Sequence, residues 1–121
     1  MTQRRVRRLD KPHADFIREL PCIICRDNIS TECCHIRMSD GRIAKPPTGI
    51  GIRPDDRFTV PMCNRHHREQ HAGSERKFWD RYNIDAVLIA LALYSISGDV
   101  EEAERIIAAY IAPIISIMSA G

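Results

Sequence analysis

The 121-residue sequence predicts a small α+β domain with flanking helices and an apolar helical pair behind it. Cysteines and histidines recur at the short spacings that metal sites use. Two short stretches of alternating character flank a loop rich in glycine and proline. The last third of the chain is strongly apolar with a helical pattern. The length fits one domain, which we divide into residues 1–12, 13–83 and 84–121.

Residues 1–12 are rich in arginine and predict a flexible basic arm. The arm can follow a phosphate backbone or can be a tail without a role. Its candidate contacts are Arg4, Arg5, Arg7 and Arg8. A helical pattern then runs from His13 to Leu20 and stops at Pro21, and we expect His13 on the surface.

Four residues predict a structural zinc site. Cys22 and Cys25 form a C-x2-C pair, and Cys63 and His66, three residues apart, complete a tetrahedral set. Clustered cysteines behind an N-terminus without an apolar run predict metal ligands in a reducing cytoplasm rather than disulfides. A redox C-x-x-C is the alternative, but no βαβ pattern surrounds it.

Two strands are expected between the halves of this set. The alternation from Ile29 to Arg37 predicts the first strand, and Arg57 to Met62 predicts the second. We expect Cys33 to be a spare cysteine facing the core, with a zinc-ligand role as the alternative. Residues 38–54 form an irregular loop whose basic side chains suit contact with a sugar-phosphate backbone. These side chains are Arg42, Lys45 and Arg53.

A short helix over residues 64–72 carries two kinds of ligand and ends before Gly73. His67 and His71 stand four residues apart on one face and can hold one ion together. His66 lies about 100° round the helix from His67, so it is better placed to join Cys63. One helix therefore serves two metal sites.

Three further helices complete the chain. Glu75 to Tyr82 is amphipathic, and we expect its aromatic residues to brace the metal-binding helix. Asp85 to Tyr94 is apolar throughout, and the last helix starts at Asp99, with Pro113 bending or ending it. This pair either packs on the core or forms a homo-oligomer contact. No stretch reaches the roughly 18 unbroken apolar residues of a membrane span, so we expect no membrane partner.

The charges are segregated along the chain. Residues 1–84 hold seventeen Lys and Arg against eleven Asp and Glu, whereas residues 85–121 hold one against five. The positive part is the part with the candidate metal sites, as a polyanion-binding surface requires. A solvated surface with uneven charge is the alternative.

In combination, these motifs resemble the HNH endonucleases of the ββα-metal fold. They look most like a phage- and prophage-encoded group related to the recombination-enhancement (Ref-like) nucleases. The resemblance covers about residues 20–82. It is carried by Cys22 and Cys25, Glu32-Cys33-Cys34-His35-Ile36-Arg37, Thr48-Gly49-Ile50-Gly51, Arg53-Pro54-Asp55-Asp56-Arg57-Phe58, Val60-Pro61-Met62-Cys63 and His67-Arg68-Glu69-Gln70-His71.

The resemblance implies a metal-dependent DNA endonuclease that hydrolyses phosphodiester bonds, with a role in DNA recombination or processing and a possible recombinase partner. It implies that His35 is the general base and that Asp56, or else Asp55, orients the loop that carries this base. His67 and His71 would hold a catalytic Mg²⁺, Mn²⁺ or Zn²⁺. Further DNA contacts would come from Arg37, at the scissile phosphate, and from Arg68.

The sequence departs from the family pattern at two positions. Asp56 stands where the family has asparagine. Cys34 stands where a histidine or aspartate ligand is common. A thiolate there would favour zinc, whereas the alternative is that Cys34 is a small buried residue. The rival interpretations of the whole chain are a non-catalytic zinc-knuckle DNA-binding protein and a structural or interaction protein.

Overall fold

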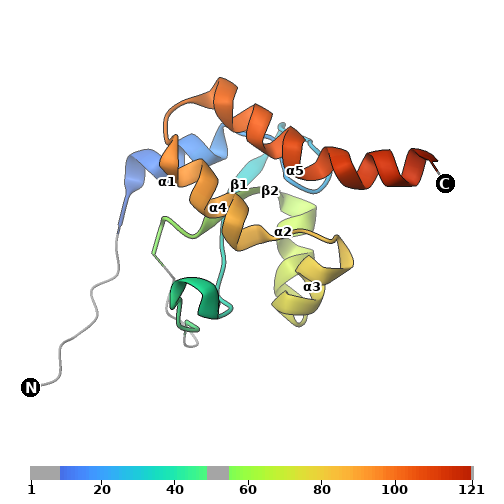
Figure 1. Cartoon of the computed structure of the whole chain (residues 1–121). Helices are drawn as coiled ribbons and strands as arrows, with labels where there is room; N and C mark the ends of the chain where they lie inside the picture. Colours follow the sequence, from blue (N-terminus) through green and yellow to red (C-terminus); the bar gives the residue numbers. More distant parts are fainter. Residues whose placement is uncertain (1–8, 49–54, 121) are drawn as a thin grey trace, which may run out of the picture.

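The computed structural model describes residues 9–48 and 55–120, with side chains up to Tyr110 (Figure 1). The described chain is a small α+β fold of five α-helices, a 3₁₀ turn and a two-stranded sheet. In order, the elements are α1 (Lys11–Arg18), β1 (Thr31–His35), η1 (Gly41–Ile43), β2 (Thr59–Cys63), α2 (Asn64–His71), α3 (Glu75–Arg81), α4 (Ala86–Ser95) and α5 (Val100–Ala120).

The sheet and the helix that follows it form the centre of the fold. β1 and β2 are antiparallel, with Thr31 opposite Cys63 and His35 opposite Thr59. β2 passes directly into α2, because Cys63 is both the last residue of the strand and the N-cap of the helix. The expected strands are therefore present but shorter than the alternation suggested, and Ile29 lies before β1 with 90% of its surface exposed.

An aliphatic core lies between the sheet, α1 and α4. Ile17 of α1 and Leu20, just after the helix, are fully buried, and so are Val60 and Met62 of β2. Complete burial of such side chains contributes roughly 1.5–3 kcal/mol each. In Figure 1, α4 lies across the two strands, while α2 and α3 stack beside them.

The C-terminal helices attach to this core through α4. The sequence of α4 is apolar all round, which suits a helix covered on several sides. Asp85 caps α4 by accepting the Leu88 amide, and Ala103 and Ile107 of α5 are buried in the same core. α5 continues through Pro113, so the proline does not end the helix. Within the described chain, no helix is long and apolar enough to cross a bilayer.

His13 is buried, and the expectation of a surface histidine is wrong. The first turn of α1 packs under α4, where the His13 ring meets Tyr94 edge-on at 4.8 Å. Its Nδ1 lies 2.7 Å from the Ser97 hydroxyl. The contact joins residues 84 positions apart, so a local pattern could not reveal it.

Cys33 packs against the core and lies outside the ligand set, as expected, but the fully buried cysteine of β1 is Cys34. Cys34 is fully buried in the core, whereas Cys33 is half-buried and packs against the edge of the core. Alternation along the strand allows one of two neighbours to be fully buried, and with α1 packed on β1 that residue is Cys34.

Candidate metal-binding and catalytic site

Cys22, Cys25, Cys63 and His66 come together in space, and their four ligand atoms all lie within 4.8 Å of one another. The Cys25 and Cys63 sulfurs are 3.8 Å apart, and the His66 Nδ1 lies 3.2 Å from the Cys63 sulfur. Zinc–sulfur bonds of about 2.3 Å in a tetrahedron give sulfur–sulfur edges of about 3.8 Å. The set therefore fits a structural zinc ion, as its chemistry predicted.

In each half of this set, a backbone amide donates to a cysteine sulfur: in the turn after Cys22, and at the start of α2 after Cys63. The Ile24 amide donates to the Cys22 sulfur at 3.4 Å, and the His66 amide donates to the Cys63 sulfur at 3.5 Å. The first turn closes through the Arg26 amide, which donates to the Cys22 carbonyl, and Arg26 adopts a left-handed φ of 65°. Amide donors of this kind stabilise a thiolate.

The ionisation of these ligands depends on their surroundings. Burial raises the pKa of the Cys22 thiol to about 11. Burial tends to raise the pKa of the Cys63 thiol as well, but hydrogen bonds to its sulfur hold this pKa below the ordinary value. The donors are the amides of His66 and Arg65 and the thiols of Cys25 and Cys22. Burial, followed by the charge of Arg65, lowers the pKa of His66, which favours the neutral imidazole that binds metal.

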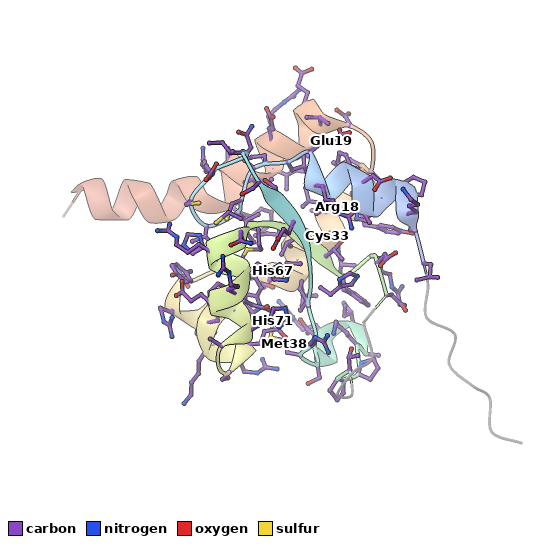
Figure 2. The ribbon with its side chains drawn as sticks, turned by 180° about the vertical axis from the view of Figure 1, so that it is seen from behind. Arg18, Glu19, Cys33, Met38, His67 and His71 are labelled. Carbon is purple, nitrogen blue, oxygen red and sulfur yellow. The ribbon has the colours of Figure 1, made fainter. Side chains whose placement is uncertain are left out.

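His67 and His71 form a second cluster, on successive turns of α2 beside β1 (Figure 2). Their Nε2 atoms are 3.1 Å apart. Two nitrogens at about 2.1 Å from one ion are separated by about 3.0 Å at a right angle and about 3.4 Å at the tetrahedral angle. The observed separation therefore suits two ligands of one ion as well as an N–H···N hydrogen bond. Burial, then the charges of His67 and Arg37, lowers the pKa of His71 and favours the neutral ring.

His35, at the end of β1, is held by Asp56. The His35 Nε2 lies 2.8 Å from the Asp56 Oδ1, and both side chains are nearly buried. Because a carboxylate only accepts, this bond places the imidazole proton on Nε2 and the basic lone pair on Nδ1. The other Asp56 oxygen accepts the Asp10 amide at 2.8 Å, so α1 and β1 meet at this carboxylate. Asp55 instead pairs with Arg57 at 3.5 Å.

Glu75 connects the exit of β1 to the helices. One of its oxygens accepts the amides of Arg37 and Met38, each at 2.9 Å. The other accepts the Gln70 amide group of α2 at 2.7 Å and the Trp79 indole at 3.2 Å. These four bonds fix the backbone of Arg37 beside α2, and the Arg37 charge acts on His71. Trp79 is 1% exposed, which leaves no ring face for base stacking.

Cys34 does not join the histidines of α2. Burial raises the pKa of its thiol well above the ordinary value, and its sulfur lies in the apolar core. Among the described residues, Cys22, Cys25, Cys63 and His66 make up the sole group of three or more metal-ligand atoms at mutual close range. The alternative of a small buried Cys34 therefore describes its position, and a ligand role for it has no support.

The basic side chains expected to contact DNA differ in their burial and in their hydrogen-bond partners. Lys45 is 4% exposed and donates to the Met38 carbonyl at 2.6 Å, so its assignment to the DNA surface is wrong. Arg42 lies between Asp40 and Asp85, and its hydrogen bonds hold the pKa of Asp40 at about 2. Arg68 donates to Asn64 one turn earlier in α2. Arg4, Arg5, Arg7, Arg8 and Arg53 lie outside the described residues.

Sequence reasoning gave no role to Glu32, Glu75 or Asp10. Each forms hydrogen bonds with residues at least 35 positions away. Glu32 bonds to His67, Glu75 accepts the amides of Arg37 and Met38, and the Asp10 amide donates to Asp56. Glu32 sits inside a motif that the resemblance already covered, so its place two residues before Cys34 was an available signal. No comparable local signal marks Glu75 or Asp10.

In comparisons with known proteins, no protein-family model, no curated protein and no solved structure matches the chain.

Proposed function

We propose that this chain is a metal-dependent DNA endonuclease of the HNH type, acting in phage or prophage DNA recombination or processing. The observation that carries the proposal is the pair of imidazole nitrogens 3.1 Å apart on α2. This helix directly follows β2, and the partner strand β1 ends at the carboxylate-held His35. A zinc-binding fold has no need of these three histidines, because Cys22, Cys25, Cys63 and His66 already complete its ligand set.

The roles follow from the chemistry of phosphodiester hydrolysis. A divalent ion bound by His67 and His71 would supply Lewis-acid stabilisation of the non-bridging and leaving oxygens. His35 accepts the proton of the attacking water at Nδ1, while Asp56 keeps the other ring nitrogen protonated and stabilises the imidazolium that forms. Arg37, fixed through its backbone by Glu75, neutralises charge on the phosphate.

A plasmid-nicking assay tests the proposal. Supercoiled plasmid is incubated with the zinc-loaded protein and Mg²⁺, Mn²⁺ or added Zn²⁺, beside His35→Ala. We expect wild-type nicking in at least one ion and a loss of about 10²–10⁴-fold in the variant, with zinc content and melting temperature retained. Equal cleavage by the variant would remove His35 from the mechanism.

The same assay separates the enzyme from a non-catalytic binding protein. Binding of the plasmid in a gel-shift measurement without nicking in any of the three ions would leave a zinc-stabilised DNA-binding protein in place of the nuclease.

A further inference from the structure

Glu32 lies beside the paired histidines of α2 but outside the ligand set that the sequence suggested. It sits in β1, opposite Met62 of β2, and its Oε1 lies 2.8 Å from the Nδ1 of His67. The His67 side chain is about one-fifth exposed and that of Glu32 somewhat under half exposed, so the pair lies at the edge of the site.

The bond determines which nitrogen of His67 carries the proton. A carboxylate is an acceptor, so the Nδ1 of His67 must be the donor and its Nε2 must present the lone pair. That Nε2 is the atom 3.1 Å from the Nε2 of His71. Glu32 therefore orients His67 with its ligand atom toward His71. Metal-binding histidines use their second nitrogen in this way in many proteins.

The carboxylate of Glu32 is itself held in place. Its second oxygen accepts the Asn64 side-chain amide at 3.4 Å, and Asn64 in turn accepts a hydrogen bond from Arg68. This chain of contacts ties β1 to the first two turns of α2. Arg68, which the sequence assigned to the DNA surface, supports Glu32 through Asn64.

Such support matters more here because Cys34 is unavailable as a third ligand. With the Cys34 sulfur in the core, the described residues offer two imidazoles to the ion, and a flexible pair of ligands binds weakly. Fixing the tautomer and the ring plane of His67 offsets part of that weakness.

We propose that Glu32 is a positioning residue for a divalent cation at His67 and His71, acting through the Nδ1 of His67. The inference rests on the proposed function for the existence of that ion site. It adds a residue that lies beyond bonding range of the ion and sets the affinity of the site.

The test measures binding of Mn²⁺ by calorimetry to protein whose cysteine site is already loaded with zinc. Glu32→Ala is expected to bind Mn²⁺ about 10–100-fold more weakly than wild type. Glu32→Gln, which keeps an oxygen acceptor but loses the charge, should fall between them. Glu69→Gln serves as the matched control, because Glu69 lies on α2 but pairs with Arg81 and Tyr82.

A second readout follows the tautomer directly. Nitrogen-15 NMR of the histidine side chains should show His67 protonated at Nδ1 in wild type and in Glu69→Gln, and a mixture of tautomers in Glu32→Ala. A structural role for Glu32 without effect on His67 would leave this spectrum unchanged, and that result overturns the inference.

The remaining outcomes separate the two proposals. Equal Mn²⁺ affinity of wild type and Glu32→Ala, with nicking intact, overturns the role of Glu32 and leaves the nuclease. Weaker binding in Glu32→Ala, with no nicking by any variant, supports the role of Glu32 and removes the nuclease. Absence of a Mn²⁺ site in wild type overturns the role of Glu32, and if nicking is also absent in Mg²⁺, Mn²⁺ and Zn²⁺, the nuclease is overturned as well.

Discussion

At the scale of single residues, His13 and His35, the two histidines outside the ligand sets, differ in the groups that compensate a charge on the ring. His35 has the Asp56 carboxylate at 2.8 Å, which stabilises a protonated ring. His13 has a hydroxyl at Nδ1, and its buried Nε2 has no hydrogen-bond partner among the described residues. One position suits proton transfer, and the other favours a neutral ring.

Because His13 is buried, the protein is predicted to lose stability in mild acid. Burial lowers its pKa, against the opposing charges of Asp10 and Asp56, so the unfolded chain binds the proton more readily. Its contribution to stability is complete above the unfolded pKa of about 6.5 and is lost as the pH falls toward the lower folded value. Melting temperatures from pH 7.5 to 5.5 should therefore fall less steeply in His13→Asn, which keeps a partner for Ser97. Parallel curves for the two proteins would contradict the prediction.

Substitution of Asp56 is predicted to reduce nicking while the protein stays folded. In Asp56→Asn, an amide replaces the carboxylate that stabilises the His35 imidazolium, and we expect nicking to slow by about 10²–10⁴-fold. Single-turnover nicking rates measure the effect. Asp55→Asn is the matched control, since the adjacent carboxylate pairs with Arg57, and its rate should stay within a few-fold of wild type. The reverse ranking would reassign the orienting carboxylate to Asp55.

At the scale of elements, two connections hold the hairpin against the helices. The zinc-ligand set joins the turn after α1 to the start of α2, and Glu75 joins the exit of β1 to α2 and α3. The site therefore depends on bonds between elements more than on any single element.

The zinc-ligand set predicts a folding defect on removal of one ligand. Cys22→Ser should lose about one zinc per chain and lower the melting temperature by more than about 10 °C, because metal binding contributes directly to folding. Metal analysis and thermal denaturation measure both effects. Cys33→Ser, at a half-buried cysteine outside the set, should keep its zinc and its melting temperature. An unchanged zinc content in Cys22→Ser would show that the ligand set is wrong.

Replacement of the Glu75 carboxylate is predicted to cause a moderate loss of stability. Glu75→Gln can still accept the Arg37 and Met38 amides, but it presents an amide group to the Gln70 and Trp79 donors. We expect a cost of about 2–3 kcal/mol in urea unfolding, since donors that lose a partner are costly. Glu101→Gln, on the exposed side of α5, should cost less than about 0.5 kcal/mol. Equal stability of the two variants would contradict the role of Glu75.

At the scale of the whole molecule, charge and structure are divided along the chain. Residues 1–84 hold seventeen Lys and Arg against eleven Asp and Glu, and four of those arginines lie within residues 1–8. The acidic remainder of the chain, with one against five, forms α4 and α5. In Figure 1, α5 runs along the side of the molecule opposite α3, and its last turns reach past the other described elements.

The basic arm predicts a change in the salt dependence of DNA binding. Deleting residues 2–8 removes four arginines, so the slope of log K against log salt should decrease by up to about 4. Fluorescence anisotropy at several salt concentrations measures the slope, and the melting temperature serves as the control for folding. An unchanged slope would assign the arm no role in binding.

The sequence by itself determined the features that depend on neighbours along the chain. Turn and helix geometry explains three short spacings, which can therefore be recognised in the sequence alone. They are the C-x2-C pair, the three-residue step from Cys63 to His66 and the four-residue step from His67 to His71. The positions of the two strands and of α2 followed from the same local periodicities, with errors at the strand ends.

Only the tertiary structure decided which side chains turn inward and which carboxylates meet which histidines. Alternation in β1 was equally compatible with Cys33 or Cys34 in the core, and no local pattern placed Lys45 or His13 inside. The pairing of Glu32 with His67 and the four bonds of Glu75 join segments far apart in the sequence. Such contacts arise from the packing of whole elements. The free energy of that packing is distributed over many residues, so no single segment of the sequence reveals it.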